Sequence, residues 1–228
     1  MVVGAICDKT TDRGLHMELV DKRATMLFPT PLFAGKVSDI SLCDRIEKKL
    51  REMQKLEQGV PHKWGKSVFF THDDLHTLPE MKELVDLIVK ESKQILDEFK
   101  IKRDSHYISC MWANITPPNN WHHMHTHANS LLSGILNVRT PENCGATIFQ
   151  DPKMPSRMIE PTYTESNGLN SAEFHIPPLK GLMMMWPSYL PHAVQYGTAK
   201  EDEDRIVVAF NIMIRGLIDR RTAILDLR

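Results

Sequence analysis

Histidines are concentrated in one short stretch of this chain. Four of its eleven histidines lie within the sequence Trp121-His122-His123-Met124-His125-Thr126-His127. Side chains of an extended chain alternate between two faces, so His125 and His127 would point the same way, about 7 Å apart. That spacing lets two imidazoles converge on one metal ion at distances of about 2.0–2.1 Å. His123 and His125 have the same spacing, so spacing alone does not choose the pair, and a histidine-rich polar loop is the alternative.

A third histidine and an arginine could complete a site. His192 follows a turn bounded by Pro187 and Pro191, and Arg205 begins the most β-prone run of the chain, 205–214. An arginine between apolar strand neighbours is costly to bury without an anion. If strands at 193–196 and 205–214 form a hairpin, His192 and Arg205 lie on the order of 15 Å apart. A five-carbon dicarboxylate could then chelate the metal at one end and meet the guanidinium at the other.

Other residues near these positions leave alternatives open. Asn211 would return to the level of His192 on the Arg205 face and could hydrogen-bond to the site from behind. The alternative for Arg205 is an ordinary ion pair with an acidic residue of the preceding turn, which holds Glu201, Asp202, Glu203 and Asp204. The run Met183-Met184-Met185 is more typical of a buried strand than of a soft-metal site.

The elements that must position these residues are short strands. Runs with β-type composition, separated by turn sequences, are expected at 106–115, 131–140, 146–149, 172–176, 182–186, 193–196 and 205–214. Leu27 to Phe33 is expected to be an edge strand, because its two prolines remove hydrogen-bond donors. The long connection from Asp151 to Asn170, which contains Met154, Arg157, Met158 and Tyr163, is typical of a lid or binding loop.

Two helices are expected before the strands. Apolar residues recur at helical spacing between Ser41 and Gly59, and the sequence Thr77-Leu78-Pro79-Glu80 resembles a capping box that begins a second helix. We therefore expect an α+β fold that is mainly β, with helices at about 41–58 and 77–99 supporting a sandwich or barrel. Residues 1–26 would be an N-terminal extension, and residues 27–228 a single domain.

Composition limits the class of protein. The 228 residues carry 28 Lys+Arg and 29 Asp+Glu, a net charge of −1 that argues against a nucleic-acid groove or an anionic membrane as partner. No apolar run reaches the roughly 20 residues that span a bilayer, and no secretory signal is visible. Four scattered cysteines (Cys7, Cys43, Cys110, Cys144) are typical of free thiols in a reducing compartment. We expect a cytoplasmic protein, in the host cytoplasm if a phage encodes it.

Taken in order, these motifs resemble the iron(II)- and 2-oxoglutarate-dependent oxygenases, in the branch common in phages and marine bacteria. The resemblance covers roughly residues 27–215. It is carried by the following segments: Leu27 to Pro31, Trp112-Ala113-Asn114, His125 to Gly134, Gly145 to Pro152, Lys180-Gly181, Trp186-Pro187-Ser188, Pro191-His192 and Arg205 to Asn211. It implies a double-stranded β-helix, or jelly roll of the cupin type, with a metal at its open end.

The resemblance also implies roles for individual residues. His125, His127 and His192 would bind Fe(II), and Arg205 would hold the far carboxylate of 2-oxoglutarate. The other expected cosubstrate-binding residues are Asn211, Asn137, Ser133 and Asn114. No catalytic residue beyond the metal ligands is expected. The implied reaction consumes O2, releases succinate and CO2, and hydroxylates a small molecule or a protein side chain.

Two positions depart from the family pattern. Most members have a carboxylate two residues after the first histidine, which gives two histidines and one carboxylate. His127 stands there in this chain, so either the site is all-imidazole or another group, such as His123 or a water, completes it. Asn137 replaces the aromatic residue usual in this branch, which could enlarge the pocket or contact the cosubstrate.

Two other functions use the same residues. A cupin-like isomerase or ligand-binding protein would need the three histidines but not Arg205, and a structural jelly roll would bind metal without turnover. The segment from Leu217 to Arg228 can pack on its own domain or on a second copy, so a monomer and a homodimer are both compatible with the sequence.

Overall fold

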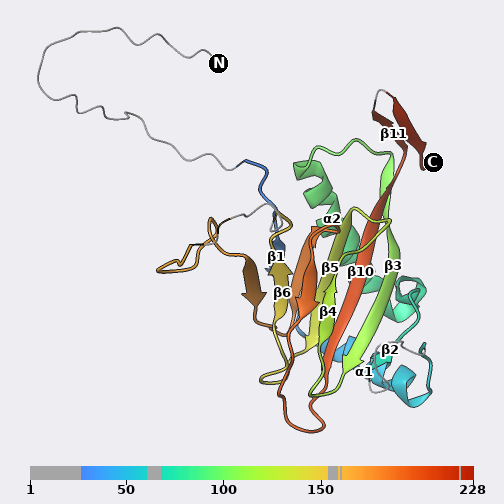
Figure 1. The fold of residues 1–228 in the computed structure, drawn as a ribbon. Coiled ribbons are helices and arrows are strands. Elements are labelled where there is room, and N and C mark those ends of the chain that lie inside the picture. Colours follow the sequence, from blue (N-terminus) through green and yellow to red (C-terminus); the bar gives the residue numbers. More distant parts are fainter. Residues whose placement is uncertain (1–26, 61–67, 154–158, 160, 221) are drawn as a thin grey trace, which may run out of the picture.

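The computed structural model describes residues 27–60, 68–153, 159, 161–220 and 222–228 (Figure 1). Residues 1–26 and three of the residues named for the lid loop (Met154, Arg157 and Met158) lie outside them. Two α-helices precede most of the strands. In chain order the elements are β1 (Phe33–Lys36), α1 (Ser41–Lys55), β2 (Phe69–Phe70), the 3-10 turns Leu75–Thr77 and Pro79–Met81, α2 (Lys82–Glu98), β3 (Ser105–Thr116), β4 (His122–His125), β5 (Leu132–Arg139), β6 (Thr147–Gln150), β7 (Glu173–Ile176), β8 (Leu182–Pro187), β9 (His192–Val194), β10 (Arg205–Arg215), β11 (Leu217–Arg220) and β12 (Ala223–Asp226).

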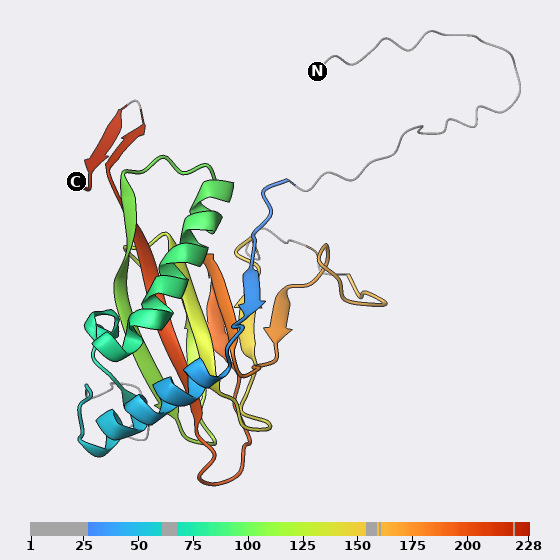
Figure 2. The ribbon, with the colours of Figure 1, turned by 180° about the vertical axis from the view of Figure 1, so that it is seen from behind.

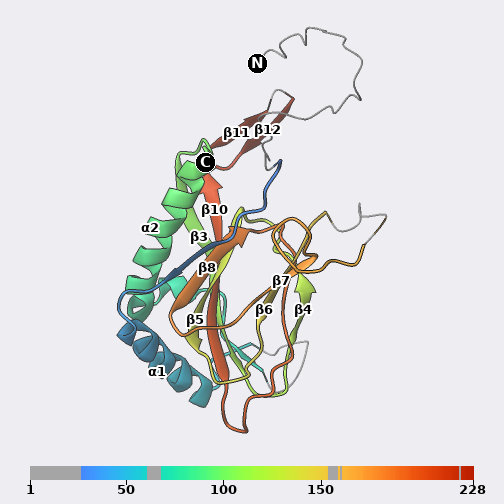
Figure 3. The same cartoon turned by 90° about the vertical axis from the view of Figure 1, so that its left-hand side faces the viewer.

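The strands form two antiparallel sheets and a terminal hairpin. The larger sheet has the order β1-β8-β5-β10-β3-β2, the smaller one β4-β9-β6-β7, and β11 pairs with β12. In side view, the two helices, the larger sheet and the smaller sheet make three successive layers (Figure 3). The helices cover only the outer face of the larger sheet (Figure 2), so its inner face is left to meet the smaller sheet.

Alternation along the strands separates two apolar clusters. One strand face of β10 carries Ile206, Val208, Phe210 and Ile212, which pack with the apolar faces of α1 and α2. The other face carries Arg205, Val207, Ala209 and Asn211 and therefore points between the sheets. A smaller cluster fills part of this interior, with the buried side chains of Phe149, Met184, Trp186 and Leu190. The polar residues of the inner face thus lie in an otherwise apolar space.

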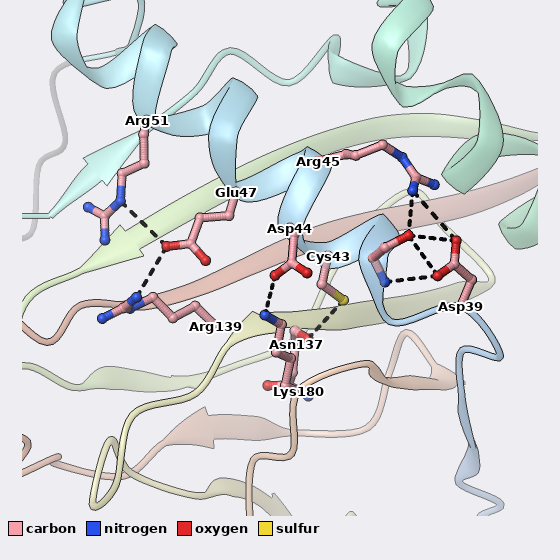
Figure 4. Close-up of polar contacts among 10 residues, drawn as sticks. Asp39, Cys43, Asp44, Arg45, Glu47, Arg51, Asn137, Arg139 and Lys180 are labelled. Carbon is pink, nitrogen blue, oxygen red and sulfur yellow. Dashed lines mark hydrogen bonds and ion pairs between the residues drawn. The ribbon is translucent and has the colours of Figure 1, made fainter.

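Helix α1 is held on the larger sheet by both apolar and polar contacts. Leu42, Ile46 and Leu50 are buried at helical spacing, and Cys43 contacts the carbonyl of Asn137 at 3.9 Å. Glu47 lies between two arginines, with Arg139 of β5 at 3.4 Å and Arg51 at 3.9 Å (Figure 4). Arg139 therefore faces the helix layer and not the interior between the sheets.

Two elements begin five or more residues later than predicted. The edge strand begins at Phe33 and not at Leu27. The capping box at Thr77 does not form, because the Thr77 hydroxyl donates to the carbonyl of Asp74 (2.8 Å). Leu78 is extended with a ψ of 133°, the conformation that a residue before proline prefers, so α2 begins only at Lys82.

The chain ends in a hairpin that projects from the body of the domain (Figure 1). Ile218 and Leu227 pack against the main core, while Leu217, Ile224 and Leu225 are exposed. Within the described residues, no helix has the length and apolar character that crossing a membrane requires.

Candidate active site

Three histidines converge where β4 meets β9. His125, the last residue of β4, lies opposite His192, the first residue of β9. His127 lies two residues beyond β4, and its backbone N–H donates to the carbonyl of Ser188 (3.0 Å). One ring nitrogen from each histidine lies within 4.8 Å of the other two, and the Nε2 atoms of His127 and His192 are 3.1 Å apart. Among the residues that the structure describes, no carboxylate joins this group.

Backbone carbonyls orient two of the three rings. Nδ1 of His125 lies 2.8 Å from the carbonyl of His123, and Nδ1 of His192 lies 2.9 Å from the carbonyl of Leu190. A carbonyl only accepts, so both Nδ1 atoms carry hydrogens and both Nε2 atoms keep free lone pairs. His127 differs, because its Nδ1 faces the side-chain amide nitrogen of Asn211 at 3.3 Å.

Burial keeps these imidazoles neutral. Burial, together with a smaller effect of the neighbouring histidines, lowers the pKa of His127 to about 4 and that of His192 to about 3. Burial also lowers the pKa of His125. The neutral ring is the form that binds a metal ion, so near pH 7 the group is ready to do so without losing protons to solvent.

The structure selects among the clustered histidines. His123 packs against Trp121 with ring centroids 4.1 Å apart and does not join the group. His122 lies against His125 at 4.4 Å, and burial lowers its pKa. Sequence reasoning gave His122 no role. The irregular register of β4 between residues 122 and 125 brings the two rings together.

Arg205 is buried in the same interior without an anionic partner. It is 4% exposed, and its Nη2 donates long hydrogen bonds of 3.3 Å to Asn137 and Thr147. Its Nε has no partner, and burial lowers the pKa of the guanidinium. No described acidic residue forms an ion pair with it. Asp204, one of the acidic residues of the preceding turn, pairs instead with Arg51 at 2.5 Å.

The hairpin considered between strands at 193–196 and 205–214 does not form. β9 belongs to the smaller sheet and β10 to the larger one, because the connection between them crosses from one sheet to the other. The two groups still face the same space. Thr147, which Arg205 contacts, lies two residues along β6 from Phe149, and Phe149 lies opposite His192. The guanidinium is therefore displaced from His192 by about 7 Å along this strand.

The other predicted site residues lie in the interior between the two sheets, some near Arg205 and some near the three histidines. Asn137 is at the Arg205 end, where it also donates to the carbonyl of Leu182 (3.0 Å). Ser133 donates to Asn211 at 2.7 Å, so both lie at the His127 end. Asn114 lies opposite Val207, two residues along β10 from Arg205.

Two buried polar atoms between the ends have no partner: Oδ1 of Asn114 and Nε1 of Trp186. The Trp186 ring is 4.9 Å from His192, and the Trp112 ring is 5.7 Å from His127. Sequence reasoning assigned no site role to Trp186, Trp112 or Thr147. An apolar interior with unpartnered polar groups is expected where a polar ligand belongs.

The donor set fits a divalent transition metal and a dianion. Neutral imidazole nitrogens suit iron, zinc, copper and nickel, and the buried guanidinium with a free Nε suits a carboxylate. The separation of Arg205 from the three histidines suits a short diacid, with one end held by the guanidinium and the other by the metal.

Comparison with known proteins identifies the class. Two facing antiparallel sheets with histidines at one end form a double-stranded β-helix, and similar folds occur in solved structures. A prolyl-4-hydroxylase from Pseudomonas putida superposes with a TM-score of 0.61 at 11% identity, covering 82% of this chain and 94% of that one. The viral collagen prolyl hydroxylase of Paramecium bursaria Chlorella virus-1 gives 0.51 at 15%, covering 79% and 94%.

A third similar structure is that of SnoN, described as a non-heme alpha-ketoglutarate-dependent epimerase from nogalamycin biosynthesis. It superposes with a TM-score of 0.62 at 12% identity, covering 85% of this chain and 80% of that one. These identities show a shared fold. A search of curated proteins gives no match for the sequence.

A family model matches part of the sequence. Residues 110–211, from β3 to the Asn211 of β10, match the family described as "Putative 2OG-Fe(II) oxygenase". This match covers just under half of the chain. It makes that part of the chain similar to the 2OG-Fe(II) oxygenases, enzymes that use Fe(II), 2-oxoglutarate and O2 to oxidise another molecule. The predicted fold and enzyme class are confirmed.

Proposed function

We propose that this oxygenase binds Fe(II) through His125, His127 and His192 and binds 2-oxoglutarate between that metal and Arg205. One observation carries the proposal: three neutral imidazoles within 4.8 Å of one another share an interior with a buried arginine that has no carboxylate partner among the described residues. The three imidazoles leave the metal with its full charge of +2. The dianionic cosubstrate would offset two of the three positive charges that the metal and Arg205 bring together.

Each remaining site residue has a distinct proposed role. Asn137 and Thr147 orient the guanidinium of Arg205, because they accept its two hydrogen bonds. Asn114 lies between the two ends, where its side-chain N–H groups, and not the unpartnered Oδ1, would donate to the cosubstrate. Ser133 and Asn211 support His127 from behind, the role that the strand pattern suggested for Asn211, in place of the direct cosubstrate contact that the resemblance implied for both.

Bound Fe(II) and 2-oxoglutarate would supply the oxidising chemistry: O2, 2-oxoglutarate and a C–H bond are converted to CO2, succinate and an alcohol. The protein positions and isolates the reactants. The rings of Trp112 and Trp186 border the histidines and limit the access of water. Arg205 fixes one end of the cosubstrate, which leaves its keto-acid end directed at the histidines.

The rival functions account for less of the structure. A cupin-like isomerase or a structural jelly roll would use the histidines, but neither gives a reason to bury Arg205 away from any acidic side chain. A buried, unpaired guanidinium is costly, and a dicarboxylate cosubstrate supplies that reason.

The substrate is proposed to be a small molecule or a protein side chain that enters beside the loop after β6. A cleft of about 860 Å³ lies there, lined largely by apolar residues that include Phe28, Tyr163 and Leu169. Phe149 and Leu190 line the same cleft and also flank His192. This proximity supports the proposal that the loop acts as a lid for an at least partly apolar substrate.

Compartment and assembly are also proposals. Cys43, Cys110 and Cys144 are free thiols, which supports a reducing, cytoplasmic location. The near-neutral net charge supports the absence of nucleic-acid and membrane partners. The projecting β11–β12 hairpin exposes Leu217, Ile224 and Leu225, which supports a homodimer through this hairpin. Light scattering on the wild type and on Ile224→Lys tests the dimer, which the substitution should dissociate.

The function is tested by anaerobic titration of Fe(II) and then 2-oxoglutarate into metal-free protein. A weak visible charge-transfer band from the chelate should grow to one equivalent of cosubstrate. Admission of air should then yield succinate even without substrate. Absence of both signals would exclude the proposed function.

A further inference from the structure

A buried row of hydroxyl groups ends at His127. The Oγ atoms of Ser130 and Ser188 are 2.6 Å apart, and those of Ser188 and Ser133 are 2.8 Å apart. Ser133 then donates to Oδ1 of Asn211 at 2.7 Å, and Nδ2 of Asn211 lies 3.3 Å from Nδ1 of His127. Ser133 and Ser188 are each 2% exposed and Asn211 is 6% exposed, so the row is closed to bulk water for most of its length.

The fold assembles this row from three distant segments. Ser133 on β5 lies opposite Asn211 on β10 in the larger sheet. Ser188 follows β8, and its backbone N–H donates to the carbonyl of Leu131 at 3.0 Å, while its own carbonyl accepts the N–H of His127. Ser188 therefore fixes the backbone of His127 and also contributes its hydroxyl to the row.

The number of available hydrogens determines which group in the row donates and which accepts. A hydroxyl has one hydrogen. Ser133 uses its hydrogen on Asn211, so Ser188 must donate to Ser133, and Ser130 must donate to Ser188. At the other end the amide nitrogen of Asn211 donates to Nδ1 of His127 and also to Sγ of Cys110 (3.2 Å). A neutral His127 that accepts at Nδ1 carries its hydrogen on Nε2, which faces Nε2 of His192.

This arrangement is incompatible with a metal at Nε2 of His127. A ligating nitrogen cannot keep its hydrogen, so the hydrogen of the neutral ring must lie on Nδ1, where it needs an acceptor. A half-turn of the Asn211 amide supplies one. Oδ1 then accepts from His127, Nδ2 donates to Ser133, and each serine hydrogen turns toward the next oxygen in the opposite direction. Only Oδ1 and Nδ2 of Asn211 exchange places, and the other heavy atoms stay where they are while the direction of the row reverses.

We propose that Asn211 and the row Ser133–Ser188–Ser130 form a reversible hydrogen-bond switch that converts His127 into a metal ligand when the ion arrives. The inference rests on the proposed metal site. His125 and His192 need no such device, because their Nδ1 hydrogens point to backbone carbonyls in every state. A carboxylate in place of His127 would not need it either, since it has no tautomers. Asn211 and the serines are positioning residues that act through His127.

Nitrogen-15 NMR of the histidine rings tests the switch directly, with Zn(II) alone as a diamagnetic probe. In metal-free protein we expect His127 to be protonated at Nε2, and in zinc-loaded protein at Nδ1. His125 and His192 should be protonated at Nδ1 in both states. If zinc shifts the His125 and His192 signals while His127 has the same tautomer before and after, the switch is refuted and the metal site stands. If zinc shifts none of these signals, the metal site itself is refuted.

Variants distinguish positioning from a general structural role. Asn211→Leu leaves Nδ1 of His127 without a partner and should weaken zinc binding by about 10–100-fold. Asn211→Asp accepts from His127 without any rearrangement and should restore binding to at least the wild-type level. Equal losses in the two variants would overturn the proposal.

Ser133→Ala interrupts the row and leaves the turned amide of Asn211 with an unpaired N–H, so zinc binding should weaken by about tenfold. The matched control is Ser109→Ala, because Ser109 also bonds to Asn211 but only to its backbone carbonyl (3.3 Å). The control should bind zinc within about twofold of the wild type. No difference between the two serine variants would count against the switch, even if Asn211→Leu fails to fold.

Discussion

Arg205→Met is the most informative single substitution in this enzyme. Methionine keeps the approximate length of the side chain and its apolar contacts on β10 and removes only the guanidinium. The structure leaves Nε of Arg205 without a partner and gives Nη2 only two long hydrogen bonds, so the group is poorly satisfied before a ligand binds. Its charge should therefore contribute to ligand binding and not to folding.

The expected loss follows from the bonds that a carboxylate would make. Two charge-assisted hydrogen bonds from one guanidinium contribute roughly 1.5–3 kcal/mol each, or about 3–6 kcal/mol together. At about 1.4 kcal/mol per tenfold change, binding of 2-oxoglutarate should weaken by at least about 100-fold. The affinity for Fe(II) should change little, because Arg205 does not contact the three histidines.

The assay is anaerobic titration of the Fe(II)-loaded variant with 2-oxoglutarate, followed by the chelate absorbance or by calorimetry. Arg139→Met is the matched control. Arg139 lies on the neighbouring strand β5 but points to Glu47 of α1 (Figure 4), so its loss should change cosubstrate affinity by less than about twofold. If Arg205→Met binds 2-oxoglutarate within about threefold of the wild type, the proposed cosubstrate site is wrong.

The same variant makes an opposite prediction for stability. A buried charge without an ionic partner costs free energy that an apolar side chain of similar size does not. Metal-free Arg205→Met should therefore unfold at the wild-type temperature or a few degrees above it. A large fall in melting temperature would show that Arg205 is a structural residue.

Three further predictions concern the rest of the site. Fe(II) or Zn(II) at 100 times its dissociation constant should stabilise the protein by about 2.7 kcal/mol. The melting temperature should rise, and a chelator should reverse the rise. His125→Ala should abolish this response, and an unchanged response in the variant would place the metal elsewhere. His127→Asp should keep metal binding, since carboxylates also bind iron, but should weaken 2-oxoglutarate binding because it replaces a neutral imidazole with a negative charge beside the dianion. Calorimetry that shows tighter binding would contradict the charge argument. Asn137→Val removes an acceptor from Arg205 and should weaken 2-oxoglutarate binding by roughly tenfold. Full affinity in the titration with 2-oxoglutarate would show that Asn137 does not orient the guanidinium.

Much of the fold could be predicted from local sequence because it depends on local periodicity. The alternation of apolar residues in β10 and the apolar run of β8 define strands wherever they are placed. The helical spacing of Leu42, Ile46 and Leu50 likewise defines a helix that must bury one face. The start of the second helix was predicted wrongly for a local reason: the Thr77 hydroxyl donates backward to the carbonyl of Asp74, and Leu78 is extended before Pro79.

The amino-acid sequence by itself determined the chemistry that is available. Imidazoles can bind a transition metal wherever they meet, and an arginine among apolar neighbours requires an anion wherever it is buried. The spacing of the cluster left His123, His125 and His127 as candidates, and it could not pair them with a histidine more than 60 residues away.

Only the tertiary structure decided which of these groups meet. The pairing of β4 with β9 brings His125 to His192, and the crossing of the chain to the second sheet places Arg205 across the interior from them. The serine row behind His127 depends on contacts among β5, β10 and the turn after β8. Strand register between distant segments is set by the packing of whole faces, so no local pattern contains it.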